Sequence, residues 1–343
     1  MNHPCDVSAD EPVTFPALYV TEAGTPAKLV ELGLGDLDPG EVTIAVEWSS
    51  LNYKDVLAVT GTAPVVRRFP MICGIDLAGK VTASTDPRLA VGSDVLVTGD
   101  GLGTEHSGGY APLARVPSSW CVPTPDGLDG RRAMALGTAG LTAMLAFLSL
   151  ETAGSGPDEL DGLPLLVTGA AGGVGTLSVL IGSRLGYDVV ASTGRPDEAE
   201  YLRRLGAAEV VDRSELSDAP HRPLAHPRFG AAVDVVGGTT LANVIASTRP
   251  LGAVAATGLV GGAELVMTVH PFILRGVTLA GINSQSLPMT LRQAAWERLA
   301  TVVPHTLLDA VTEEINLGGV LDIAPAMLAG RVRGRVVVTP RTA

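Results

Sequence analysis

The stretch Val167-Thr168-Gly169-Ala170-Ala171-Gly172-Gly173-Val174-Gly175 decides how this chain folds. An apolar run from Leu163 to Val167 leads into it, and an apolar run rich in small residues, Thr176 to Leu185, follows it. This order predicts a strand, a glycine turn and a helix. Such a turn lets the backbone approach a pyrophosphate, which the free amides and the dipole of the helix start then face. Glycine-rich turns also serve purely as turns, so the motif needs support from the rest of the chain.

Length, composition and charge indicate the size of the protein and the partners that it does not bind. The length of 343 residues suggests two domains, and a hydrophobic content of 46% provides for a large core. The formal net charge of −12 argues against nucleic acid or an anionic membrane surface as the main partner. Cys5, Cys73 and Cys121 lie far apart and form no disulfide framework or zinc signature. We therefore expect a protein of the reducing cytoplasm.

Two segments bear on location. Residues 1–14 are polar and acidic, which predicts a flexible leader and not a signal peptide. The run from Ala133 to Leu150 carries no charge and is about long enough to cross a bilayer. Its small polar residues and the absence of a basic flanking pattern favour a buried helix that joins two domains.

The remaining chain changes its pattern at this helix. Before it, short apolar runs such as Phe15–Val20, Val42–Trp48 and Val95–Thr98 alternate with Gly and Pro turns, which is typical of a compact β-rich unit. After it, strands and helices alternate from Leu165 onward, which predicts a parallel sheet covered on both faces. A final β run, Arg335–Thr339, stands alone at the end of the chain.

The second strand of the alternating part indicates which dinucleotide binds. It ends in Ser192-Thr193-Gly194-Arg195, where an NAD site usually has an acidic residue for the ribose hydroxyl. A guanidinium at Arg195 can clamp a 2′-phosphate in a bidentate manner, and the Thr193 hydroxyl can donate to it. We therefore expect NADPH as the cofactor. The alternative is that Arg195 is a solvated residue near a helix start.

Several motifs together resemble a known family. They are Trp48-Ser49-Ser50-Leu51-Asn52-Tyr53-Lys54-Asp55, Arg68-Phe69-Pro70-Met71, Gly74-Ile75-Asp76, Gly137-Thr138-Ala139-Gly140, the 169–175 turn, Thr193-Gly194-Arg195 and Pro271-Phe272-Ile273-Leu274-Arg275. The chain resembles the zinc-free medium-chain dehydrogenase/reductase superfamily, and within it the NADPH-dependent acrylyl-CoA reductases, which are quinone-oxidoreductase-like.

Two departures from the wider superfamily are visible. Ala170 occupies the place of the first glycine of the usual fingerprint. Gly74-Ile75-Asp76 stands where zinc alcohol dehydrogenases have Gly-His-Glu, and isoleucine cannot ligate zinc. We therefore expect no bound metal.

The resemblance implies an α/β fold in which a GroES-like β-rich catalytic domain is split around a doubly wound Rossmann domain. The expected boundaries are a leader over 1–14, the first catalytic part over 15–136, the Rossmann NADP-binding domain over 137–284 and a return to the catalytic domain over 285–343.

The resemblance also implies residue roles that the pattern alone does not. Without it, Leu259 and Ile273 would be ordinary core, Ser284 a turn residue and Arg335 an edge charge. Tyr53 contacts the cofactor in this interpretation and is also the candidate catalytic residue; the alternative is a half-buried structural tyrosine. The full expected cofactor site is Tyr53, Ala171, Gly172, Gly173, Val174, Thr193, Gly194, Arg195, Arg213, Leu259, Ile273, Ser284 and Arg335.

The implied function is the NADPH-dependent reduction of an enoyl-CoA thioester, with acrylyl-CoA as the acyl-CoA substrate and propanoyl-CoA as the product. Quinone reduction by NADPH and non-catalytic NADPH sensing are the alternatives, and the family suggests a homodimer. Arg67 and Arg68 could meet coenzyme A phosphates or be surface charges. His106 could face the substrate cleft or be an exposed loop residue.

Overall fold

The computed structural model describes residues 14–218 and 222–341. Residues 1–13 of the expected leader therefore lie outside the described part. Thr14, the last residue of the expected leader, is the first residue of strand β1.

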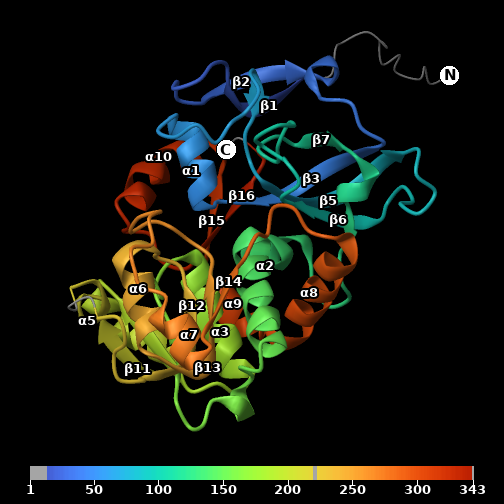
Figure 1. The fold of residues 1–343 in the computed structure, drawn as a ribbon. Helices are drawn as coiled ribbons and strands as arrows, with labels where there is room; N and C mark the ends of the chain where they lie inside the picture. The colour runs from blue at the N-terminus through green and yellow to red at the C-terminus, as the bar shows by residue number, and fades with distance from the viewer. Residues whose placement is uncertain (1–13, 219–221, 342–343) are drawn as a thin grey trace, which may run out of the picture.

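The β-rich part contains two sheets (Figure 1). Strand β1 pairs antiparallel with β2 and with β4, and a larger seven-stranded sheet has the order β15-β16-β3-β5-β6-β8, with β7 also on β3. Alternation explains the inner strands: along β3, Val42, Ile44 and Val46 point into the core. The bounds are β1 Thr14–Val20, β2 Lys28–Gly33, β3 Val42–Ser50, α1 Tyr53–Thr60, β4 Met71–Ile72, β5 Asp76–Ser84, β6 Asp94–Thr98, β7 Leu113–Val116 and β8 Val122–Pro123.

The α/β part confirms the expected doubly wound sheet. Six parallel strands have the order β11-β10-β9-β12-β13-β14, and helices cover both faces (Figure 1). The first strand and helix fall where the glycine motif predicts them. The bounds are β9 Leu165–Val167, α3 Gly173–Arg184, β10 Val189–Thr193, α4 Ala199–Arg204, β11 Ala207–Asp212, α5 Ser214–Ser217, β12 Phe229–Asp234, α6 Gly238–Ala246, β13 Thr248–Ala256, α7 His270–Arg275 and β14 Thr278–Gly281.

The end of the chain returns to the β-rich part. Strand β16 pairs antiparallel with β3 and parallel with β15, so it extends the catalytic sheet and not the Rossmann sheet. The expected split of the catalytic domain is thus confirmed. The last elements are α8 Met289–Val302, α9 His305–Ala310, β15 Thr312–Asn316, α10 Leu317–Leu328 and β16 Arg335–Thr339. Short 3-10 helices are η1 Leu34–Asp36, η2 Ser118–Trp120, η3 Pro157–Glu159 and η4 Pro196–Glu198.

Helix α2, Gly130–Thr152, lies at the centre of the molecule (Figure 1). It packs on β3 and β5 of the catalytic domain and on α3 and β13 of the Rossmann domain. It is long and apolar enough to cross a membrane, yet 83% of its most apolar window is buried inside the protein. The expected buried helix between two domains is confirmed.

We expect that Gly175→Ala destabilises the protein because α3 packs tightly on its own turn. A Cβ at this position would lie 2.2 Å from the Gly169 carbonyl oxygen and 2.7 Å from the Ala170 Cα. Overpacking of this kind costs about 1 to 3 kcal/mol of unfolding free energy, measurable by urea denaturation. The matched control is Gly172→Ala in the same turn, whose Cβ would meet only the Gly169 oxygen at 3.4 Å. Equal stability of the two variants would contradict the packing argument.

Candidate active site

The glycine turn between β9 and α3 brings positive charge to the start of the helix. The first amides of α3, beginning at Gly173, have no acceptor within their own helix. The Arg335 guanidinium lies beside them, since a Cβ on Gly173 would be 3.0 Å from its Nη1 atom. Open amides, a helix dipole and a guanidinium converge here, so these residues fit the pyrophosphate of a dinucleotide.

Two arginines stand at the ends of neighbouring strands, Arg195 after β10 and Arg213 after β11. Arg195 donates from Nη2 to the Ala171 carbonyl (2.8 Å) and from Nη1 to the Val332 carbonyl (3.2 Å), which ties it to the glycine turn. Arg213 lies against Gly194, where a Cβ would be 2.5 Å from its Nε atom. The structure thus brings Thr193, Gly194, Arg195 and Arg213 together, as a 2′-phosphate site requires. Arg195 is braced by backbone carbonyls and is not the freely solvated residue of the alternative.

The other expected cofactor contacts lie beyond β13. Leu259 and Ile273 are 66% and 73% exposed, so the alternative that they are core residues is wrong. Ser284 follows β14, and its Oγ lies 2.8 Å from the Thr142 Oγ1 on α2. This hydrogen bond ties the segment after β14 to the central helix.

A break in α2 organises the centre of the site. Gly137 has φ 51° and ψ −156°, which interrupts the helix. Backbone groups freed by the break find side-chain partners. The Thr138 amide donates to the Asp76 carboxylate (2.8 Å), and the Arg335 Nε donates to the Ala135 carbonyl (2.7 Å). A Cβ on Gly137 would lie 2.7 Å from Asp76 Oδ2, so this position requires glycine.

Asn52 connects this break to the start of α1. Its Nδ2 donates to Asp76 Oδ2 (2.8 Å), while its Oδ1 accepts from Arg335 Nη2 (3.4 Å). The Asp55 carboxylate accepts from the Asn52 amide (2.9 Å) and the Ile75 amide (2.8 Å), which caps the helix. We call Asn52, Asp55, Asp76, Thr138 and Arg335 the junction cluster.

Burial governs the electrostatics of the junction cluster. It raises the pKa of Asp55 to about 7, and the Asp76 carboxylate acts in the same direction. Burial lowers the pKa of Arg335, which Asp76 and Asp55 counteract. Arg335 is only 2% exposed, so the alternative of an edge charge is wrong. The buried guanidinium of Arg335 lies near the carboxylates of Asp55 and Asp76, so no charge in the junction cluster is buried without an opposite charge nearby.

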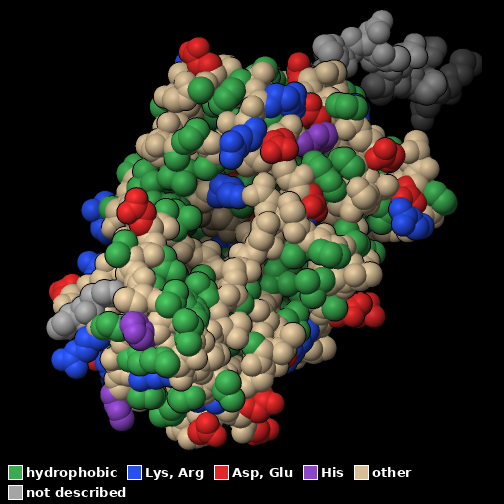
Figure 2. Space-filling view, viewed as in Figure 1, with side chains coloured by type: hydrophobic (Ala, Val, Ile, Leu, Met, Phe, Trp, Pro, Cys, Tyr) green, Lys and Arg blue, Asp and Glu red, His purple; other side chains and the backbone are tan. Residues whose placement is uncertain are grey.

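Tyr53 and Lys54 follow the junction cluster at the first turn of α1. The Tyr53 side chain is 44% exposed, which leaves its hydroxyl available to a ligand. Lys54 is half-buried, and its Nζ donates to Gln285 Oε1 (2.7 Å). In the space-filling view, a hollow opens between the β-rich and α/β parts, with Lys or Arg side chains at its upper edge (Figure 2).

Three other candidates have different positions. Arg68 pairs with Asp38 and donates to the Glu105 carbonyl (3.0 Å), so it is a structural residue. Arg67 is exposed and makes no side-chain hydrogen bond or ion pair within the described residues. His106 is not an exposed loop residue: its side chain is 13% exposed, and its Nε2 lies 2.7 Å from the Arg115 carbonyl oxygen.

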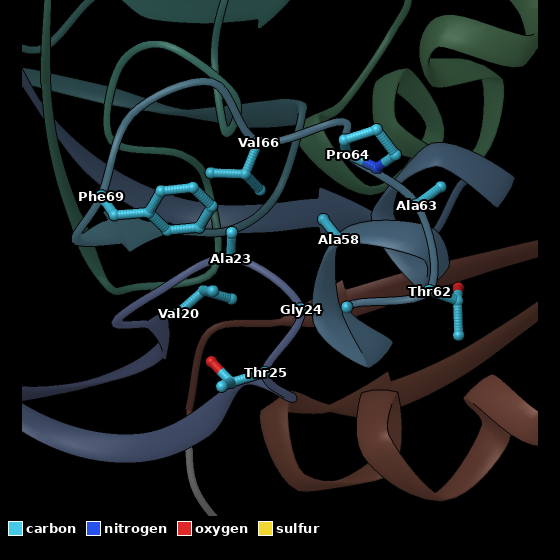
Figure 3. Close-up of a pocket in the computed structure, with 11 residues that line it drawn as sticks. Val20, Ala23, Gly24, Thr25, Ala58, Thr62, Ala63, Pro64, Val66 and Phe69 are labelled. Atoms are coloured by element: carbon cyan, nitrogen blue, oxygen red, sulfur yellow. The ribbon is translucent and has the colours of Figure 1, made fainter.

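A separate apolar hollow of about 250 Å³ lies at the far end of α1 (Figure 3). The turn after β1 and the loop after α1 form its walls. None of its lining side chains is ionisable, so it offers no acid–base chemistry. The lining residues are Val20, Ala23, Gly24, Thr25, Ala58, Gly61, Thr62, Ala63, Pro64, Val66 and Phe69.

Across residues 14–218 and 222–341, no group of three or more His, Cys, Asp or Glu side chains could hold a metal ion. Ile75, at the position of the zinc-binding histidine, has no side-chain atom that could ligate a metal, and its backbone amide donates to Asp55. The absence of zinc stays a prediction.

Comparisons with known proteins agree with this architecture. Residues 38–126 match the alcohol dehydrogenase GroES-like domain, and residues 173–301 match the zinc-binding dehydrogenase family. Acrylyl-CoA reductase AcuI of Ruegeria pomeroyi is 47% identical over 94% of this chain and 98% of its own length.

Two solved structures are similar throughout. Escherichia coli YhdH with bound NADPH is 44% identical, with a TM-score of 0.91 over 95% of this chain and 100% of that one. Bacillus subtilis YhfP with NAD bound is 40% identical, with a TM-score of 0.91 over 95% of this chain and 99% of that one. YhfP carries the name putative quinone oxidoreductase.

The fold and the site define a medium-chain dehydrogenase/reductase. Within this class, the chain belongs to the family of the acrylyl-CoA reductase AcuI, as the sequence motifs indicate.

Sequence reasoning missed most of the junction cluster. The motifs that carry the resemblance contain Asp55, Asp76 and Thr138, but no role was assigned to them. One signal was available: Asp76 stands alone between the apolar residues Ile75 and Leu77 at the start of a buried strand. A lone buried acid requires a partner, although the sequence does not say which one.

We expect the stability of the protein to fall as pH rises through about 7, because of Asp55. Its pKa is raised to about 7 in the folded state, against about 3.9 when unfolded. Between pH about 4 and about 7, the Asp55 carboxyl is protonated in the folded state and ionised in the unfolded state. The contribution of Asp55 to the free energy of unfolding is therefore full below pH about 4 and is lost as pH rises through about 7. Asp55→Asn should flatten the slope of the urea midpoint between pH 5 and 8. Asp188→Asn, at an exposed carboxyl, is the control, and equal slopes in all three proteins would contradict the assignment.

Proposed function

We propose that this protein reduces the conjugated double bond of an enoyl-CoA thioester, with NADPH as the hydride donor and acrylyl-CoA as the substrate. The observation that carries the proposal is the joined site itself. Arg195 donates to the Ala171 carbonyl of the dinucleotide turn, while Arg335 donates to Asn52 at the start of α1 and lies beside the start of α3. The relative that is 47% identical over nearly its full length is named an acrylyl-CoA reductase.

The residues that would hold the cofactor fall into two groups. Arg335 and the α3 amides would bind the pyrophosphate, and Arg195, Arg213 and Thr193 would bind the 2′-phosphate. When bound, NADPH supplies a hydride to the β carbon of the substrate. Tyr53 would position the nicotinamide end, because it is 44% exposed and begins α1 directly after Asn52 of the junction cluster. No metal is required for this chemistry, since conjugation with the carbonyl makes the β carbon electrophilic.

The assembly and compartment belong to the same proposal. Strand β14 ends the Rossmann sheet, and exposed apolar side chains lie before and along α7 near it: Val260, Val266, Val269 and Leu274. An open strand edge beside apolar surface suits a second copy of this chain, so we propose a homodimer. Cys73 and Cys121 are free and buried, which suits the cytoplasm. The acidic net charge makes nucleic acid and membrane surfaces unsuitable partners.

The test is NADPH consumption with acrylyl-CoA, crotonyl-CoA and a simple quinone. We expect the highest kcat/KM with acrylyl-CoA. Preference for the quinone would support the alternative activity, for which the name of YhfP is the one specific observation. Tight NADPH binding without turnover of any acceptor would instead indicate a sensor.

Arg195→Ala should weaken NADPH binding by roughly ten- to a hundred-fold and leave NADH binding nearly unchanged. A hydrogen bond to a charged group contributes about 1.5 to 3 kcal/mol, and tenfold in affinity is about 1.4 kcal/mol. Fluorescence titration of both cofactors measures the effect. The control is Arg204→Ala, an exposed arginine whose described partner is Glu200 at 3.0 Å. Equal loss of both cofactors would mean that Arg195 serves only to brace the Ala171 carbonyl.

A further inference from the structure

Lys54 stands beside two residues of the expected cofactor site. It follows Tyr53 on α1, and its partner Gln285 follows Ser284 in the segment after β14. The Lys54–Gln285 hydrogen bond, 2.7 Å long, therefore joins the catalytic domain to the end of the Rossmann sheet. This places an ammonium group at the junction of the two domains, where the reacting carbon atoms of the substrate have to lie.

Hydrogen bonds to its backbone carbonyl fix the position of Gln285. Its carbonyl oxygen accepts from the Asp100 amide (2.8 Å) and from Arg292 Nη2 (3.2 Å). Arg292 is itself fully buried and also donates to Asp100 Oδ2 (2.8 Å). The backbone of Gln285 is thus fixed by two hydrogen bonds, and its side-chain amide in turn positions the Lys54 ammonium.

The partner of Lys54 is neutral, which distinguishes this lysine from a structural one. Among the described residues, Gln285 is the one hydrogen-bond partner of its ammonium. An ammonium carries three donors, so two remain for a ligand. By contrast, Lys80 is exposed and pairs with the Asp94 carboxylate at 2.6 Å.

The charged groups that act on Lys54 all belong to the catalytic domain. Burial lowers the pKa of Lys54, the Asp55 and Asp76 carboxylates raise it, and Arg67 lowers it. The two carboxylates are already engaged by the junction cluster, so they sustain the positive charge without forming an ion pair with Lys54.

We propose that the Lys54 ammonium donates a hydrogen bond to the thioester oxygen of the substrate and stabilises the enolate that forms during reduction. This inference rests on the proposed function. Hydride addition to the β carbon moves the electron pair of the double bond toward the carbonyl and leaves negative charge on the oxygen. Lys54 keeps its proton and stabilises that charge. The α carbon then takes a proton from water, and the carbonyl re-forms to give the saturated thioester.

The experiment compares Lys54→Met and Lys54→Gln with the wild type and with Lys80→Met as a control. We expect kcat for acrylyl-CoA to fall by about 10²- to 10³-fold in both Lys54 variants, the usual loss of an oxyanion donor. The KM for acrylyl-CoA should change little, and NADPH affinity in a fluorescence titration should stay at the wild-type value. Far-UV circular dichroism and the unfolding midpoint check that each variant folds.

A conservative variant supplies a second readout. In the wild type, kcat should fall as pH rises through the lysine pKa, which burial lowers. Lys54→Arg should retain more activity than Lys54→Met and hold it to higher pH, because the guanidinium stays protonated. Tyr53→Phe should behave differently, with a raised KM for NADPH and little change in kcat.

Each outcome has one meaning. Wild-type kcat in Lys54→Met, or a parallel fall in NADPH affinity, would overturn the role of Lys54 while the proposed function stands. If the wild type itself fails to reduce acrylyl-CoA, the proposed function fails and this role fails with it.

Discussion

Two opposite charges occupy the break in helix α2, and the rest of the structure depends on them. The Asp76 carboxylate accepts from the amide that begins the second half of the helix, while Arg335 donates to a carbonyl that ends the first half. The negative group thus meets the positive helix start, and the positive group meets the negative helix end. Removing an ion from water costs several kcal/mol, so neither charge would be stable here without the other and the broken backbone.

This arrangement joins three distant parts of the chain. Asp76 comes from the first catalytic segment, the break at Gly137 from the central helix, and Arg335 from the final strand. Arg335 also reaches the start of α3 in the Rossmann domain. The geometry of the cleft is therefore set by the junction cluster, which fixes the first turn of α1 relative to the dinucleotide turn. Because Tyr53 and Lys54 lie in this first turn, the junction cluster also sets their positions.

Most secondary structure was predictable because local patterns determine it. The apolar strand, glycine turn and helix around 165–184 occur in the expected order and place, and the alternation that follows predicts the parallel sheet. The sequence pattern did not predict helix α10, because its helix signals are weak. Leu317–Leu328 forms α10 although it contains two glycines and Pro325, because Asn316 caps its start and the apolar face packs on the core.

The sequence by itself determined the family, the order of the two domains and the residue types expected at the cofactor site. These follow from short motifs and from periodicity, which are local properties of the chain. Only the tertiary structure decided that Arg335 is buried, that His106 is a structural residue and that Lys54 meets Gln285 across the domain junction. The side-chain hydrogen bonds of Arg335 join residues as many as 284 positions apart, as its bond to the Leu51 carbonyl shows. The partner of a buried charge is chosen by how the sheets and helices pack, and no local pattern records that choice.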